Sequence, residues 1–266
     1  MQHPQLLQEL KDVLGQEHTI INKQKSRRFR FGWRTGGGDA LAVVKPQTLL
    51  SFYQTLQVCV KHNSIIIMQA ANTGLTEGST PSGDDYDRPI IIINTLAMNQ
   101  IYLLEQGQQV LSFSGATLFS LENLLKPIKR TPHSVIGSSC LGASVVGGIA
   151  NNSGGALIKR GPAYTEMALF ARVDEQGELQ LVNHLGIELG ETPEQILSNL
   201  MAGNFAKNNL VPSEAQCSDG EYQQRVRQVD ETSPSRYNAD PRRLFEASGC
   251  AGKLAVFAVR LDTFAV

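Results

Sequence analysis

The residues of this sequence that are best suited to bind an anion lie between Gln69 and Pro81, in the stretch QAANTGLTEGSTP. Gly74 and Gly78 allow backbone angles and a close approach that a bulkier residue would forbid. Successive free N–H groups in such a turn can form a concave nest. Side-chain donors are added by Asn72, Thr73, Thr76, Ser79 and Thr80. The stretch therefore predicts a diphosphate site that needs no lysine, and the alternative is an ordinary polar loop.

A second glycine-rich stretch, IGSSCLGASVVGGIANNSGG, runs from Ile136 to Gly155. Its segment from Gly137 to Ser144 nearly matches the phosphate loop GxxxxGK[ST] of nucleoside triphosphatases, but Ala143 stands where the lysine must be. No GxGxxG follows a strand, so a Rossmann nicotinamide site has no support. The small residues let a flat ligand or another backbone lie very close. A tightly packed small-residue helix is the alternative, and it is compatible with a ligand site.

Both stretches depend on the elements that position them. An apolar run at 65–68 predicts a strand directly before the first stretch, and an earlier strand at 41–44 is followed by a helix at 48–62. This order implies a parallel pairing with a right-handed crossover, and it places the anion loop at the carboxyl end of a strand. Further strands are expected at 90–93, 101–104, 110–113, 166–173, 178–182 and 254–261, and helices at 4–14, 118–125 and 192–200. Residues 204–238 are polar and contain prolines, which predicts a surface excursion or a mobile loop.

The overall charge argues against a polyanion as partner, because the net charge is -1 and 18% of the residues are charged. One stretch, Lys23 to Arg34, carries six basic and no acidic residues together with Phe29, Phe31 and Trp33. Such a mixture can serve nucleic-acid binding. Since the rest of the chain balances these charges, a solvated or cofactor-facing surface is favoured, and no nucleic-acid partner is expected.

The positions of the cysteines and the hydropathy of the chain narrow the class of protein further. The cysteines form no CxxC pair, so neither a zinc site nor a disulfide framework is indicated, no metal is expected and a reducing compartment fits best. They are Cys59, Cys140, Cys217 and Cys250. The N-terminal stretch lacks a signal-peptide core, and no apolar run approaches the roughly 18 residues of a membrane span. We therefore expect a soluble chain whose 266 residues form one large domain or two packed lobes.

Four stretches together carry a resemblance to a known family: AANTGLTEGSTP, IGSSCLGASVVGGIANNSGG, KRGPAYTEMALFARV and GCAGKLAVFAVRL. They resemble the FAD-binding domain of the vanillyl-alcohol oxidase and p-cresol methylhydroxylase superfamily. Within it, nearly the whole chain is similar to the N-terminal half of the respiratory, quinone-dependent D-lactate dehydrogenases. The resemblance implies an α+β fold with two lobes and FAD extended in the groove between them. Residues 1–98 would hold a small parallel sheet and the pyrophosphate loop 69–81, and residues 99–266 a mostly antiparallel sheet.

The resemblance also implies which residues contact FAD, mostly through main-chain groups. The pyrophosphate loop would consist of Ala70, Ala71, Asn72, Thr73, Gly74, Gly78 and Ser79. The flavin and ribityl or adenosine parts would be approached by Gly137, Ser144 and Gly154, and the backbone of Val256 would contact the cofactor. We expect FAD to be bound noncovalently, because residues 69–87 contain no histidine and Cys140 is more simply a small buried residue.

The implied activity is the oxidation of D-lactate to pyruvate, with electrons passed to a membrane quinone. In this family the full-length protein is peripheral on the cytoplasmic side of the inner (plasma) membrane, and the substrate base and carboxylate clamp belong to a separate cap domain. This chain ends at Val266, so we expect the cap and the membrane-associating region to be absent and this chain alone to be inactive. No catalytic residue is assigned, because a lone histidine such as His133 or His184 is more often structural.

Two other readings remain open. Another FAD-dependent oxidoreductase of the same superfamily, such as a glycolate oxidase subunit or UDP-N-acetylenolpyruvylglucosamine reductase, would share the cofactor site and differ in the substrate half. A non-enzymatic FAD-binding module is the third reading. Assays of a full-length protein with D-lactate, glycolate and a quinone analogue discriminate between them.

Overall fold

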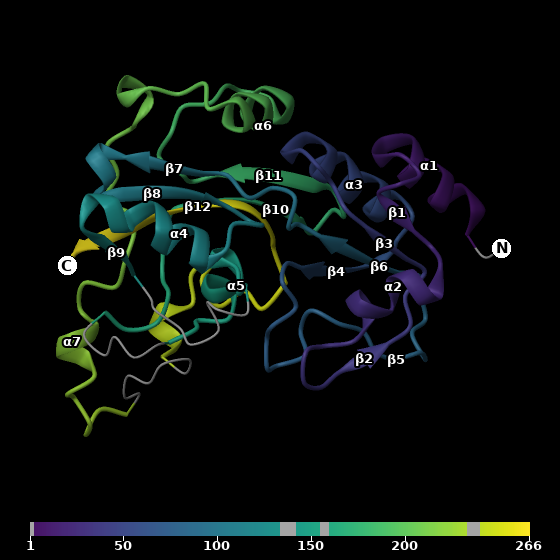
Figure 1. Cartoon of the computed structure of the whole chain (residues 1–266), viewed down its shortest axis with the longest axis horizontal. Coiled ribbons are helices and arrows are strands. Elements are labelled where there is room, and N and C mark those ends of the chain that lie inside the picture. The colour runs from purple at the N-terminus through teal and green to yellow at the C-terminus, as the bar shows by residue number, and fades with distance from the viewer. Residues whose placement is uncertain (1–2, 134–141, 155–159, 233–239) are drawn as a thin grey trace. The chain divides into compact units, whose positions relative to one another are not determined.

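The computed structural model describes residues 3–133, 142–154, 160–232 and 240–266, and the chain divides into two compact units (Figure 1). The first unit comprises Met1–Met98, Ala171–Leu181 and Leu189–Asn204. The second comprises Asn99–Phe170, Val182–Glu188 and Phe205–Val266. Each unit contains most of one sheet, with helices packed on it. In the part of the chain that the structure describes, no helix has the length and apolar character needed to cross a membrane.

The sheet of the first unit consists, in spatial order, of β1 (Thr19–Ile20), β3 (Ala42–Val44), β6 (Ile90–Asn94) and β4 (Ile65–Gln69). β3 and β4 both pair in parallel with β6, so their predicted parallel direction is confirmed. The prediction that β3 and β4 pair directly with each other is wrong, because β6 lies between them. Every residue of β6 is buried, and a fully buried strand is favoured in the centre of a sheet, where both edges of its backbone find partners. β1 adds a short antiparallel edge, which makes the sheet mixed.

Four helices and one further strand pair complete the first unit. They are α1 (Pro4–Leu14), α2 (Lys23–Arg30), α3 (Leu49–Lys61), α6 (Pro193–Ala202), β2 (Gly37–Gly38) and β5 (Ser82–Gly83). α3 begins at a capping box, in which Thr48 and Ser51 each accept a hydrogen bond from the main chain of the other. α1 and α6 both pack against α3, and the inner faces of all three are apolar. Helices predicted at 4–14, 48–62 and 192–200 are therefore confirmed.

The larger sheet, most of which lies in the second unit, has the order β11-β10-β12-β8-β7, with β9 also paired to β12. Its strands are β7 (Ile101–Leu104), β8 (Gln109–Phe113), β9 (Arg130–Pro132), β10 (Ala168–Val173), β11 (Leu179–Asn183) and β12 (Ala255–Ala265). The predicted hairpin is confirmed by the antiparallel pairing of β7 with β8. β12 extends beyond the predicted strand because its last residues, Thr263–Ala265, find a partner in β9. The sheet is antiparallel in every pairing described here, as the resemblance implied.

Helices α4 (Leu118–Leu125) and α5 (Val145–Ala150) share one hydrophobic core with this sheet. Leu121 and Leu125 of α4, Ile149 of α5, and Phe170 and Val259 of the sheet are buried together. Short helical turns occur at η1 (Glu105–Gly107), η2 (Lys126–Ile128), η4 (Lys207–Asn209) and η5 (Pro241–Arg243), and α7 (Tyr222–Arg225) is a single short helix. This core fixes the position of α5, the one element that the second glycine-rich stretch forms among the described residues.

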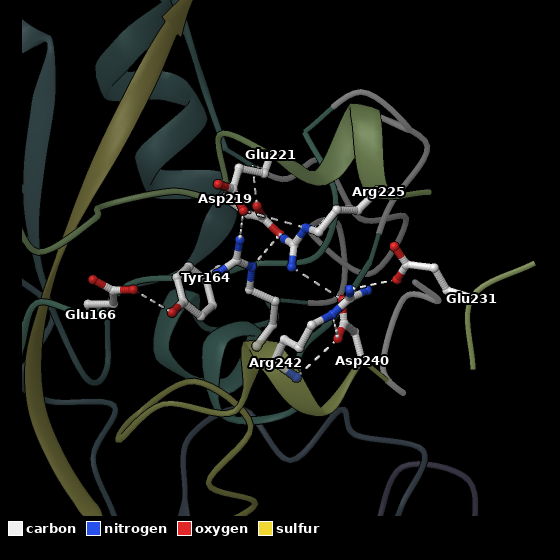
Figure 2. A network of polar contacts seen from close by, with 9 residues as sticks. Tyr164, Glu166, Asp219, Glu221, Arg225, Glu231, Asp240 and Arg242 are labelled. Atoms are coloured by element: carbon white, nitrogen blue, oxygen red, sulfur yellow. Dashed lines mark hydrogen bonds and ion pairs between the residues drawn. The ribbon is translucent and has the colours of Figure 1, made fainter. Parts of the chain in front are cut away.

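The predicted surface excursion at 204–238 is wrong for the segment around α7. Cys217, Asp219 and Tyr222 are all buried. Figure 2 shows the reason: Arg225 lies between the carboxylates of Asp219 and Asp240, so charged side chains neutralise one another inside the fold. A polar composition therefore marks a buried ion-pair network here instead of a solvated loop.

Candidate cofactor site

The anion loop directly follows β4, at the carboxyl end of a strand of a predominantly parallel sheet. Its two residues with left-handed backbone are Asn72 (φ 57°) and Glu77 (φ 60°). Gly74 and Gly78 do not have positive φ, so the prediction that these glycines supply special backbone angles is wrong. Asparagine tolerates the left-handed region because its short polar side chain can form local hydrogen bonds. The glycines instead leave space, since a Cβ atom added at either one would meet no atom within 4 Å.

The main chain of the loop offers donors that are free of internal partners. Within the described residues, the N–H groups of Ala71, Asn72, Thr73 and Gly74 donate no hydrogen bond. No lysine or arginine occurs between Gln69 and Pro81. An anion bound here would therefore be held by neutral N–H dipoles, as in other backbone nests.

The side chains of Asn72 and Ser79 were predicted as donors to the ligand, but in the structure both donate to other groups of the protein. Asn72 Nδ2 donates to Phe31 O at 2.7 Å, and the Ser79 hydroxyl donates to Asn72 Oδ1 at 2.7 Å. These two bonds join the ends of the loop to each other and to the segment after α2. The Ser79 hydroxyl hydrogen and one of the two Asn72 amide hydrogens are thus used to shape the loop.

In the second unit, Ser144 begins α5 as its N-cap. Its hydroxyl accepts a hydrogen bond from Gly147 N at 3.0 Å, and Ala116 O accepts one from Val145 N. The small-residue helix suggested as the alternative for this stretch is therefore present. Gly154 lies four residues after the helix and is half-buried. Gly137 and Cys140 lie outside the described residues.

Val256 lies near the start of β12, against which α5 packs. Its side chain is buried in the core that contains α5. The ladder between β8 and β12 begins at Ala258, so it stops short of Val256. The second unit thus brings α5, which Ser144 caps, and the strand of Val256 into one packed assembly, while the anion loop belongs to the first unit.

The two histidines considered for chemistry are in different surroundings. His133 is buried, and neither ring nitrogen has a hydrogen-bond partner among the residues that the structure describes. Burial lowers the pKa of His133 to about 4, and the positive charge of Arg160 adds to this effect. His184 is about half exposed, and its Nδ1 lies 2.7 Å from Glu246 Oε1. A buried, neutral imidazole is a poor proton acceptor near neutral pH, so His133 is not assigned a catalytic role.

Two buried residues that support the anion loop were not singled out from the sequence. They are Gln69, the last residue of β4, and Asn94, the last residue of β6. Their side-chain amides are joined at 3.2 Å. The available signal was a polar residue at the end of each of two isoleucine-rich strands, IIIMQ and IIIIN, where a buried polar group needs partners.

These features define a class. An α+β chain with a cation-free backbone nest at a strand end, and a small-residue helix packed on an antiparallel sheet, has the features of a domain that binds a nucleotide cofactor through its diphosphate. A family model described as "FAD binding domain" matches residues 40–182, and the chain belongs to this family. FAD is its cofactor. The nest fits the diphosphate of FAD, because several N–H groups lack partners in the described part of the chain and the two glycines leave open space beside them.

The relatives support a narrower comparison. The chain is 59% identical over 258 residues to quinone-dependent D-lactate dehydrogenase of Escherichia coli (strain K12). The matched region covers 97% of this chain and 45% of that protein. It is 58% identical to the same-named protein of Haemophilus influenzae, with 98% of this chain and 46% of that protein covered. The chain thus spans less than half of the length of these relatives.

Solved structures show the same fold at low sequence identity. Alkyldihydroxyacetonephosphate synthase matches 100% of this chain and 41% of its own chain, with a TM-score of 0.62 and 15% identity. p-Cresol methylhydroxylase matches 98% of this chain and 43% of its own, with a TM-score of 0.56 and 12% identity. This confirms the α+β fold implied by the resemblance.

Proposed function

We propose that this chain is the FAD-binding part of a flavin-dependent D-lactate dehydrogenase that passes electrons to a membrane quinone. The observation that carries the proposal is the 59% identity over 97% of the chain to a quinone-dependent D-lactate dehydrogenase. The matched region includes the whole anion loop and the whole second glycine-rich stretch. At this identity the same loops are expected to hold the same cofactor.

The reaction removes two electrons and two protons from D-lactate to give pyruvate, and a quinone takes up two electrons and two protons. When bound, FAD supplies the two-electron acceptor that links these half-reactions. The part of this chain is to bind and orient that group. We propose that the diphosphate is held by main-chain groups of the first loop and that the small residues of the second stretch lie close to the rest of the cofactor. The proposed contacts are Ala70, Ala71, Asn72, Thr73, Gly74, Gly78, Ser79, Gly137, Ser144, Gly154 and Val256.

We assign no catalytic base or substrate clamp to this chain. The relatives carry more than half of their length outside the matched region, and we propose that these groups lie there. We also propose residues 1–98 and 99–266 as the two lobes, noncovalent attachment of FAD, and a peripheral location of the full-length protein on the cytoplasmic side of the inner membrane. The quinone in the relatives' name supports the location.

The test is an assay of the complete polypeptide that contains this chain, with D-lactate, L-lactate and glycolate as donors and a soluble quinone analogue as acceptor. We expect D-lactate to be oxidised with quinone reduction in equal amounts. Preference for glycolate would point to a related oxidoreductase, and bound FAD without turnover of any donor to a binding module. Either result would overturn the proposed substrate.

A further inference from the structure

A small network of buried side-chain amides lies directly beneath the anion loop. Gln69 is only 3% exposed and Asn94 only 2%, so both amides must find partners inside the protein. Gln69 Nε2 donates to Phe29 O and to Ser79 O, each at 2.7 Å, and Gln69 Oε1 accepts from Asn94 Nδ2 at 3.2 Å. Asn94 Nδ2 also donates to Ala70 O at 2.9 Å. Every hydrogen of the two amides is thus used.

The direction of the Gln69 amide follows from its partners. A flipped side chain would place Oε1 against two carbonyl oxygens, which cannot donate. The main chain at Gln69 is also fixed, because Thr95 N donates to Gln69 O at 2.9 Å at the end of the parallel ladder between β4 and β6. The sheet therefore positions a rigid pair of donors under the loop.

These bonds decide which dipoles of the loop face outward. A backbone that binds an anion must present N–H groups and keep its carbonyl oxygens away from the negative charge. Buried amides hold the carbonyl oxygens of Phe29, Ala70 and Ser79, and Asn72 Nδ2 holds that of Phe31. The N–H groups of residues 71–74 keep no internal partner within the described residues. The bonds to Ala70 O and Ser79 O thus engage two carbonyl oxygens of the loop, and those to Phe29 O and Phe31 O tie the loop to the end of α2 and the residue after it.

We propose that Gln69 is a positioning residue for the cofactor's diphosphate: by holding Phe29 O and Ser79 O in the interior, it keeps the nest in its binding shape. The inference rests on the proposed FAD contacts of residues 70–79. It differs from a purely stabilising role, because it requires selective loss of binding to flavins that carry a diphosphate. FMN, which lacks the diphosphate bridge and the adenosine, serves as the comparison ligand.

The test compares Gln69→Glu with a matched control, Asn199→Asp. Glutamate has nearly the same shape as glutamine but cannot donate to Phe29 O and Ser79 O. Asn199 lies in the same unit, is half-buried, and donates through Nδ2 to Leu189 O at 2.8 Å, away from the loop. Both substitutions remove an amide donor and add a carboxylate. Folding of each variant is checked by circular dichroism and thermal unfolding, and FAD and FMN are titrated into each by flavin fluorescence.

We expect Gln69→Glu to weaken FAD binding about tenfold or more while FMN binding changes little, because only FAD engages the nest. Asn199→Asp should change neither affinity. If Gln69→Glu does not fold, Asn94→Ala serves instead, since it removes the donor to Ala70 O and the partner of Gln69 Oε1; the same loss of FAD preference is expected. Unchanged FAD affinity in a folded variant, or equal losses for FAD and FMN, would overturn the inference. Absence of FAD binding in the unsubstituted chain would instead contradict the proposed cofactor contacts.

Discussion

Gly74 combines open space with ordinary backbone angles, which makes it a direct probe of the nest. An added Cβ would meet nothing within 4 Å, and its φ is not positive, so a larger residue costs little strain. We expect Gly74→Val to fold with unchanged stability but to bind FAD at least about tenfold more weakly, because the side chain would occupy the space the diphosphate needs. Flavin fluorescence titration and thermal unfolding measure the two effects.

Gly220 supplies the control for this substitution, since it also has open space and no positive φ but lies in the second unit, outside both glycine-rich stretches. Gly220→Val should leave FAD affinity unchanged. Equal FAD affinity in folded Gly74→Val and in the unsubstituted chain would show that the diphosphate does not approach this residue.

The buried side chain of His133 should make the stability of the protein depend on pH. Burial lowers its pKa to about 4, with a smaller contribution from Arg160, whereas in the unfolded chain it has the usual value of about 6.5. Between these values the unfolded state binds more protons, so stability is fully present above about pH 6.5 and is lost as pH falls toward about 4. We expect the free energy of unfolding to drop by about 2 kcal/mol between about pH 7 and pH 5 through this residue.

Urea unfolding at the two pH values measures this drop in the unsubstituted chain and in His133→Leu. The leucine variant should lose that part of the pH dependence, and His3→Gln, at an exposed position, should retain it. An identical pH dependence in His133→Leu would mean that His133 titrates normally in the folded protein.

At the scale of elements, the segment around α7 depends on a buried cation. Arg225 pairs with Asp219 and Asp240, and its side chain is only 10% exposed. Removing the Arg225 side chain leaves the negative charges of the buried carboxylates less well neutralised, although Arg243 still contacts Asp219 at 2.9 Å. We expect Arg225→Met to lower the free energy of unfolding by about 3 kcal/mol, measured by urea unfolding at neutral pH.

Lys61→Met is the matched control, because Lys61 also pairs with a carboxylate, Glu9 at 2.8 Å, but is 61% exposed. Exposed pairs contribute about 1 kcal/mol or less, so this variant should be nearly as stable as the unsubstituted chain. Equal effects of the two substitutions would show that the network around Arg225 is not desolvated.

The elements also show what the sequence could and could not predict. α1, α4 and the hairpin of β7 and β8 follow from local spacing of apolar residues, and local spacing is sufficient for them. The place of β6 between β3 and β4 depends on pairings between strands far apart in the chain, and chain order does not contain that information. Likewise, the charges around Arg225 suggest exposure until their partners, many residues away, are known.

The candidate site, too, has features that the sequence predicts and features that it does not. Its first loop could be located from glycine, polar residues and a preceding strand, since these are local signals. Its conformation could not, because the left-handed Asn72 is fixed by bonds to Phe31 and Ser79, and the carbonyls are held by Gln69. Contacts between residues far apart in the chain decide such details, and a single sequence does not show them.

At the scale of the whole molecule, we expect this chain to be sufficient for binding of the cofactor but not for oxidation of the substrate. The relatives that this chain matches have more than half of their length outside the matched region, while both glycine-rich stretches lie within it. We therefore expect the chain to take up FAD but not to oxidise D-lactate. When the chain is loaded with FAD under anaerobic conditions, its flavin absorbance should stay unchanged on addition of D-lactate. Addition of dithionite should bleach the absorbance, which shows that the bound flavin can be reduced. The complete polypeptide, treated in the same way, should bleach with D-lactate. Bleaching of the present chain by D-lactate at a similar rate would place the substrate base and clamp within these 266 residues and contradict their proposed position.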